Sequence, residues 1–225
     1  MDSAHTLFFN HSRHTVTVDG QGALLDVLAF SGTEALSETF CYAIEVTSPN
    51  LDIAAETMLG KDASFSMHAA PPSVTIRGFT PPPVAPLRTL HGVITRFKRV
   101  SASREDARYE LTLEPHLALL DKGQQFRIYQ NQSVPEVVES ILRRHGLRGQ
   151  DFLIDLGRTY KQHEQLLQYG ESDLAYIKRL CAERGIWFSF SMDARLKIDV
   201  VEFHDSPMHY QRDLSLPLRP LSGLE

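Results

Sequence analysis

The chain has 225 residues, of which 42% are hydrophobic and 23% are charged. These fractions are typical of a globular protein and exclude a collagen-like, coiled-coil or disordered chain. The formal net charge is -5, and this mild acidity argues against a nucleic-acid-binding protein, which normally presents a strongly basic face.

The two cysteines, Cys41 and Cys181, lie far apart in apolar surroundings. Isolated cysteines of this kind are typical of small buried side chains rather than of a disulfide or a zinc site. The first residues lack the basic and apolar regions of a secretory leader, and no segment reaches the ~18 apolar residues of a membrane span. We therefore expect a protein that folds in a reducing compartment, with no stable membrane insertion.

The first half of the chain is predicted to consist mainly of strands. Apolar or alternating stretches bounded by turn residues occur at 6–9, 15–18, 24–30, 40–47 and 63–68. A short helix is expected over 51–59, with Asp52 as its N-cap and Gly60 as its stop. The clearest hairpin joins 89–100 to 109–114 through a polar connection.

A proline-rich window separates two of these strands. Six of the 12 prolines lie between residues 70 and 88. Because proline donates no backbone hydrogen bond, this window is incompatible with a central strand or a helix. We expect an exposed loop, which is either a variable surface insertion or a ligand for a partner domain.

Two helices follow. Ser133 and Glu136 form a capping box ahead of an apolar stripe, and Gly146 ends that helix. Ser172 is expected to cap the second helix, which stops at Gly185. Strand-like alternation then returns over 186–190 and 196–200.

This order predicts an α+β, mainly β fold in which a β-barrel is split by an inserted helical or mixed subdomain. Residues 1–115 are expected to form the first part of the barrel, and 116–185 the inserted α-rich subdomain. The hairpin 186–205 is expected to return to the barrel. Residues 206–225 are expected to connect to something further along, so we interpret the chain as a fragment.

No combination of residues predicts catalysis. The segment Gly170–Asp173 lacks the second glycine of a nucleophile elbow, and Ser172 is already explained as a helix cap. The adjacent residues His204, Asp205 and Ser206 point to opposite faces of an extended chain, so they indicate a strand end and a turn.

Metal and acid–base sites are also not predicted. His11 and His14 lack the spacing of a zincin motif, and His145 and His163 are expected to be ordinary surface histidines. Two acidic residues, Glu171 and Asp173, suit a helix N-terminus through the helix dipole. We therefore expect no enzyme activity, no metal and no cofactor.

Four ordered segments resemble the VgrG proteins, the spike proteins of type VI secretion. They are FSGTEALSETF at 30–40, LHGVIT at 90–95, RIYQNQSVP at 127–135, and QYGESDL at 168–174 followed by Arg179-Leu180 and by Glu183 with Gly185-Ile186. The residues that carry the resemblance are Gly32, Leu36, Phe40, Gly92, Arg127, Gln130, Gln168, Tyr169, Glu171, Ser172, Asp173 and Gly185. We call these the signature residues and expect them to have structural roles.

The resemblance implies a fold like the tailed-phage baseplate hub and a structural function. It implies that such a chain is the N-terminal hub part of the puncturing tip, and that this hub forms a homotrimer and joins the hexameric Hcp tube to the spike. It also implies that residues 206–225 connect toward a second barrel that the chain lacks. Its other implied partners are baseplate components and effectors or adaptors, and nucleic acid is not among them. The implied location is the bacterial cytoplasm before firing and the medium or the target cell afterwards. The alternatives are a free-standing binding module and, less favoured, a secreted cell-wall or ester hydrolase.

Overall fold

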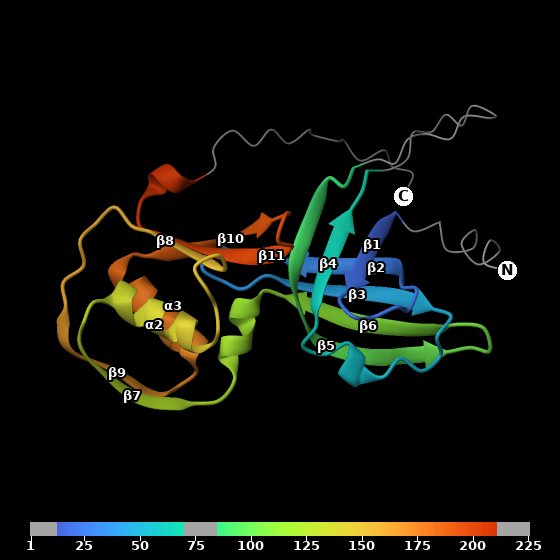
Figure 1. The fold of residues 1–225 in the computed structure, drawn as a ribbon, viewed down its shortest axis with the longest axis horizontal. Coiled ribbons are helices and arrows are strands. Elements are labelled where there is room, and N and C mark those ends of the chain that lie inside the picture. The colour runs from blue at the N-terminus through green and yellow to red at the C-terminus, as the bar shows by residue number, and fades with distance from the viewer. Residues whose placement is uncertain (1–12, 70–84, 211–225) are drawn as a thin grey trace, which may run out of the picture.

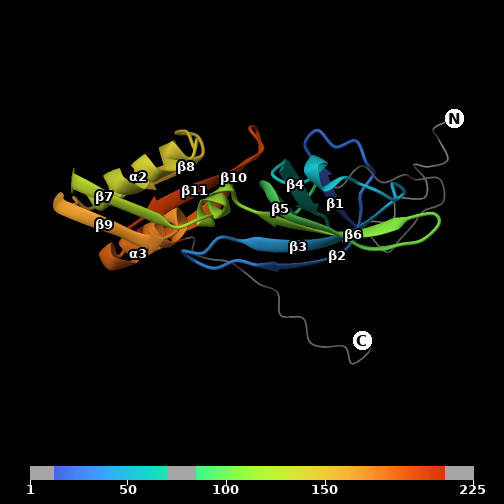
Figure 2. The ribbon, with the colours of Figure 1, turned by 90° about the horizontal axis from the view of Figure 1, so that it is seen from below.

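The computed structural model describes residues 13–69 and 85–210. The strand expected at 6–9, most of the proline window and the tail beyond residue 210 lie outside the described residues. The described residues form two lobes that lie side by side in both views, a barrel lobe and a mixed lobe (Figures 1 and 2).

The barrel lobe is a closed barrel with the strand order β1-β2-β3-β6-β5-β4. All neighbouring strands are antiparallel, and β1 closes the barrel through five residue pairs with β4 and one pair with β2. Its strands are β1 (His14–Val18), β2 (Asp26–Thr33), β3 (Cys41–Ser48), β4 (Asp62–Met67), β5 (Arg88–Ala102) and β6 (Ala107–Glu114).

Alternation in the sequence creates the barrel core. On β3, Tyr42, Ile44 and Val46 are buried, while the residues between them are only half-buried, as the two-residue period of a strand requires. They meet Leu111 and Leu113 on β6. The mainly β class and the hairpin β5–β6 that we expected are therefore confirmed.

The helix expected over 51–59 is reduced to one 3-10 turn, η1 (Ala55–Thr57). Its start is held in extended form by Tyr109 of β6, whose hydroxyl accepts from the Ile53 amide at 3.1 Å and donates to the Asn50 carbonyl at 2.8 Å. These contacts with the barrel override the helical pattern, and Asp52 does not act as an N-cap.

The mixed lobe has three layers: the sheet β10-β11-β8, two helices, and the two-stranded ribbon β7-β9 (Figure 1). The layers share one core that includes Tyr129, Val137, Ile177, Phe188 and Phe203. The elements are η2 (His116–Asp121), β7 (Gln125–Gln132), α2 (Val134–Arg144), β8 (Phe152–Asp155), β9 (His163–Glu171), α3 (Asp173–Arg184), β10 (Trp187–Asp193), β11 (Ile198–His204) and η3 (Pro207–His209).

Both helices begin and end as the sequence predicts. Glu136 accepts from the Ser133 amide at 2.6 Å, which completes the capping box of α2. Ser172 accepts from the Ala175 amide at 3.1 Å, and Gly185 ends α3 with a φ of 66°. Cys41 and Cys181 are both free thiols, and burial raises the pKa of Cys181 to about 12.

We expected the hairpin 186–205 to return to the barrel, and the structure shows a different pairing. Strand β10 pairs with β11, and β11 pairs in parallel with β8, whereas the barrel closes with strands from residues 14–114 alone. The physical reason is that β8, which the sequence pattern did not reveal, supplies the partner strand. The inward side chains Phe188 and Phe203 then complete the core of the mixed lobe.

The hairpin nevertheless contacts the barrel lobe. The Ser37 amide donates to the Phe188 carbonyl at 2.9 Å, and the rings of Phe40 and Phe190 meet edge-to-face at 5.3 Å. Phe190 packs against the cores of both lobes. Among the helices of the described residues, we find none with the length and hydrophobicity needed to cross a bilayer.

Candidate interaction surface

Three signature residues meet in the mixed lobe, where Arg127 and Gln168 surround the buried carboxylate of Asp173. Asp173, at the start of α3, accepts from Arg127 of β7 at 3.0 Å and from Gln168 of β9 at 2.8 Å. His145, just after α2, places its Nε2 atom 2.7 Å from the same carboxylate. The Asp173 cluster therefore ties both strands of the ribbon to both helices.

The Asp173 side chain is only 3% exposed, so its carboxylate is buried. Burial alone would raise the pKa of the Asp173 carboxyl, but the hydrogen bonds from His145, Gln168 and Arg127 outweigh it and hold the pKa below its ordinary value. The carboxylate is thus ionised and fully occupied as an acceptor, which suits a structural role.

The two signature residues before Asp173 are also engaged. Glu171 accepts two hydrogen bonds from Arg179 of α3, the shorter at 2.6 Å, and this pairing raises the pKa of the arginine. The Ser172 hydroxyl caps α3 and donates to Asp121 at 2.6 Å. The Ser172 hydroxyl therefore has a structural role, and its hydrogen bonds among the described residues are with Asp121 and the Ala175 amide, not with a histidine.

Strands β7 and β9 also present an apolar outer face. Phe126 pairs with Tyr169 and Ile128 pairs with Leu167, and the exposed fractions of these four side chains are 62%, 75%, 57% and 51%. The rings of Phe126 and Tyr169 lie edge-to-face at 5.1 Å. We call this set the ribbon face.

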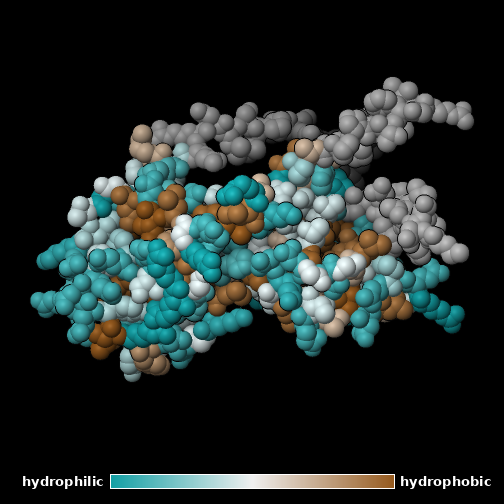
Figure 3. Space-filling model, in the orientation of Figure 1, coloured by the Kyte–Doolittle hydropathy of each residue, from teal (hydrophilic) through white to brown (hydrophobic). Residues whose placement is uncertain are grey.

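The ribbon face is uncharged and hydrophobic. The next pair along the ribbon is Gln130 with Gln165, both exposed. Figure 3 shows hydrophobic surface at the lower left, where Figure 1 places β7 and β9. Clustered exposed aromatic and aliphatic side chains of this kind mark interaction sites.

Four further signature residues, Gly32, Leu36, Phe40 and Gly92, lie in or beside the barrel lobe. A Cβ atom at Gly32 would lie 2.2 Å from the Tyr42 ring, and one at Gly92 would lie 2.4 Å from the Glu114 carbonyl oxygen, so both positions require glycine. Phe40 is buried, whereas Leu36 is half exposed.

Two histidines have partners that we did not expect. His145 is exposed, as expected, but its ring is hydrogen-bonded to Asp173, whereas His163 is half-buried and its ring is hydrogen-bonded to Arg184. The sequence offers no signal for these pairings, since the partners are 28 and 21 residues away. The segment His204–Ser206 is a strand end followed by a turn, as expected.

Comparison with known proteins identifies the family. The model of the phage tail baseplate hub (GPD) family matches residues 33–225, which is more than half of the chain. The chain belongs to this family.

Curated relatives of this hub-family chain include type VI secretion system spike proteins. The chain is 33% identical over 185 residues to the type VI secretion system spike protein VgrG4b of Pseudomonas aeruginosa, covering 82% of this chain and 21% of that protein. It is 29% identical over 222 residues to VgrG1c of the same organism, covering 96% and 28%. The chain thus spans about a quarter of the length of these relatives.

Solved structures show the same fold. The E. coli c3393 protein, described as a component of the type VI secretion system with structural similarity to the T4 bacteriophage tail proteins gp27 and gp5, is 49% identical with a TM-score of 0.81. The match covers 91% of this chain and 53% of that chain. A prophage tail protein from Shewanella oneidensis shares only the fold, with a TM-score of 0.50 and 13% identity over 84% of this chain and 52% of that chain.

Proposed function

We propose that this chain is the hub part of a type VI secretion puncturing tip, which trimerises, joins the hexameric Hcp tube to the spike and aids effector delivery. Membership of the baseplate hub family over residues 33–225 supports this proposal most strongly, together with the similarity to VgrG spike proteins. The proposed role is mechanical and needs no catalytic group, because a hub transmits force through broad, well-packed interfaces.

The ribbon face is the surface that we assign to trimerisation, with a second copy of this protein as its occupant. Four large apolar side chains lie together on one face of β7 and β9, and the two glutamines beside them carry no charge. An uncharged apolar face is suited to a permanent interface between copies, since obligate interfaces resemble a divided core.

The signature residues would then divide by role. The Asp173 cluster, Gly32 and Gly92 fix the shape of each lobe, and Tyr169 projects from the ribbon face toward the neighbouring copy. Baseplate components and effectors or adaptors are the further partners that we propose. The cytoplasm before firing, and the medium or target cell afterwards, are the proposed locations.

Light scattering and a tube pull-down test this proposal in the full-length protein that contains the chain. We expect a mass three times that of one copy and retention by immobilised Hcp. The double variant Phe126→Ser/Tyr169→Ser is expected to lower the trimer fraction at least tenfold. Val100→Ser is the matched control, because Val100 is a 49% exposed apolar residue on the barrel lobe.

Other outcomes would refute specific parts of the proposal. A trimer unaffected by the double variant would remove the ribbon face from the interface while leaving the hub role intact. A monomer that binds a peptide or glycan tightly and is not retained by immobilised Hcp would favour the free-standing binding module. Turnover of a peptidoglycan or ester substrate would favour the hydrolase.

A further inference from the structure

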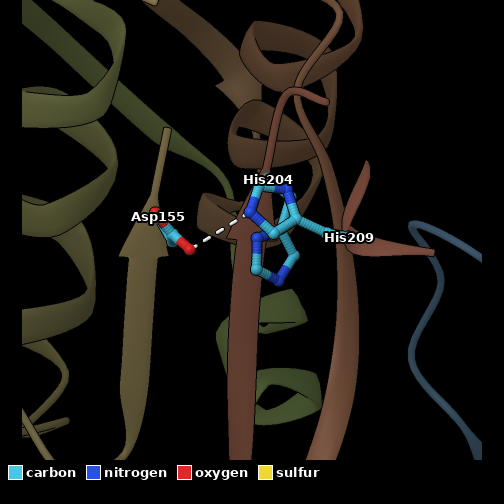
Figure 4. A group of neighbouring side chains, drawn as sticks. All are labelled: Asp155, His204 and His209. Atoms are coloured by element: carbon cyan, nitrogen blue, oxygen red, sulfur yellow. Dashed lines mark ion pairs between the residues drawn. The ribbon is translucent and has the colours of Figure 1, made fainter. Parts of the chain in front are cut away.

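Three potential metal ligands, which belong to neither the Asp173 cluster nor the ribbon face, meet at the end of the β10-β11-β8 sheet. Asp155 ends β8, His204 ends β11, and His209 belongs to η3. Each offers one ligand atom, and the three atoms all lie within 4.8 Å of one another. Figure 4 shows the Asp155 carboxylate directed toward the two imidazole rings.

The strand register places two of these three residues, Asp155 and His204, next to each other. His204 pairs with Asp155 in the parallel pair β11–β8 and with Trp187 in the antiparallel pair β10–β11. The ring centroids of Trp187 and His204 lie 4.8 Å apart, so the indole packs against one side of the imidazole. The two ligands are therefore placed by rigid backbone pairing, which favours a defined site.

A short structured turn supplies the third ligand. Ser206 accepts from the Met208 amide at 3.2 Å, and Pro207 occupies the first position of η3. This turn places the His209 ring over His204, with centroids 4.3 Å apart, and brings His209 Nε2 to 3.2 Å from Asp155.

The imidazole of His204 is buried, and one of its two ring nitrogens makes no hydrogen bond with the described residues. The residue is 5% exposed, and its Nδ1 atom has no hydrogen-bond partner among the described residues. Its Nε2 atom lies 3.5 Å from the Glu202 carboxylate, which can orient the ring. A buried polar atom without a partner is destabilising, and a bound ligand would remove this destabilisation.

We propose that Asp155, His204 and His209 form a Zn²⁺ site, with water in the remaining position. Two imidazoles and one carboxylate are ligands that zinc prefers, and three protein ligands plus water is a common zinc coordination. Zinc ligands lie about 2.0–2.2 Å from the ion, so neighbouring ligand atoms are about 3.3 Å apart. The His209–Asp155 separation of 3.2 Å meets this requirement, and the separations from the His204 ligand atom are at most 4.8 Å. The bound ion would fasten η3 to the sheet.

The chain's single tryptophan provides a local readout. The Trp187 ring lies beside His204, with centroids 4.8 Å apart, so a paramagnetic Co²⁺ ion in the site should quench its fluorescence. We expect quenching of the 225-residue chain to saturate at one equivalent of Co²⁺ and to be reversed by Zn²⁺. Calorimetry with Zn²⁺ should give the same stoichiometry, and Zn²⁺ should raise the melting temperature relative to the chelated protein.

Two variants test the ligands without disturbing the core, because the side chains of His209 and Asp155 are 31% and 56% exposed. His209→Ala and Asp155→Asn should each weaken the Co²⁺ and Zn²⁺ affinities at least tenfold, with unchanged far-ultraviolet circular dichroism. His163→Ala is the matched control, a half-buried histidine outside the group, and it should bind as the unmodified chain does.

Two results would overturn the zinc site. One is the absence of stoichiometric quenching and of calorimetric Zn²⁺ binding in the unmodified chain. The other is retention of the original affinity by His209→Ala and Asp155→Asn, which would show that the metal binds elsewhere. Neither result bears on the proposed hub role, because that role rests on the family match and the ribbon face.

Discussion

At the scale of single residues, Asp173 holds the mixed lobe together. Its carboxylate receives hydrogen bonds from two strands of the ribbon and contacts the histidine that follows α2. Asp173→Ala should lower the free energy of unfolding by about 3 kcal/mol, because it leaves Arg127 and His145 without their acceptor. Urea denaturation measures this loss.

The matched control is Glu139→Gln, which removes an exposed i,i+4 ion pair with Arg143. This change should alter stability by less than about 0.5 kcal/mol. Equal effects of the two substitutions would mean that the Asp173 cluster contributes no more than a surface pair.

His116 gives the protein a pH-dependent link between its lobes. It lies 2.6 Å from Asp199 of β11 and 3.1 Å from Asp62 of β4. The hydrogen bond with Asp199, followed by that with Asp62, raises the pKa of His116 to about 9 against the opposing effect of burial. His116 is therefore protonated at neutral pH.

The raised pKa determines the sign of the pH effect. Protonated His116 stabilises the fold fully below pH ~6.5, the unfolded value, and this contribution disappears as the pH rises through ~9. We expect the difference in unfolding free energy between the unmodified chain and His116→Gln to shrink by about 2 kcal/mol, after allowance for solvent screening, between pH 6 and pH 9.5. A constant difference across this range would contradict the assignment.

The sequence predicts some of these residue roles and not others. Ser133, Glu136 and Ser172 are recognisable because caps depend on spacings of three residues. The pairing of His116 with Asp199 spans 83 residues, so no local pattern reveals it. The zinc ligands Asp155 and His209 are likewise brought together only by the fold.

At the scale of the elements, Gly92 sets how closely β5 approaches the end of β6. Gly92→Ala would place a methyl group 2.4 Å from the Glu114 carbonyl oxygen, so the strands must separate. We expect a loss of about 2 kcal/mol and a melting temperature lower by about 4–8 °C. Differential scanning calorimetry measures the shift.

Gly22→Ala is the control for the intrinsic effect of replacing glycine. A Cβ atom at Gly22 would meet no heavy atom within 4 Å, so this substitution should leave the melting temperature within about 2 °C of the original. Similar melting temperatures for both variants would show that the β5–β6 approach is not tight.

Strands differ in how well the sequence reveals them. The barrel strands alternate clearly, and their hairpin β5–β6 follows from that alternation. Strand β7 has the sequence QFRIYQNQ. Its residues Phe126 and Ile128 are exposed and Tyr129 is buried, so apolar residues lie on both faces and the strand lacks a simple apolar–polar alternation. Strand β8 has only four residues, too few for a periodic signal, and missing it led to the wrong partner for the hairpin.

At the scale of the whole molecule, Phe190 couples the two lobes. It packs against both cores and meets Phe40 across the boundary. Phe190→Ala should cost about 2 kcal/mol and split the calorimetric transition into two, because each lobe has its own core. Leu153→Ala is the control, since Leu153 is 47% exposed and belongs to neither core. A single transition in both variants would argue against this coupling.

The proposed assembly depends on the covering of the ribbon face, and covalent footprinting tests this directly. The side chains of Phe126 and Tyr169 should be labelled readily in the 225-residue chain, where they are 62% and 75% exposed. In the full-length protein assembled as a spike, we expect their labelling to fall at least fivefold, while labelling of Val100 stays constant. Equal labelling of Phe126 and Tyr169 in both forms would contradict the proposal that this face joins the copies.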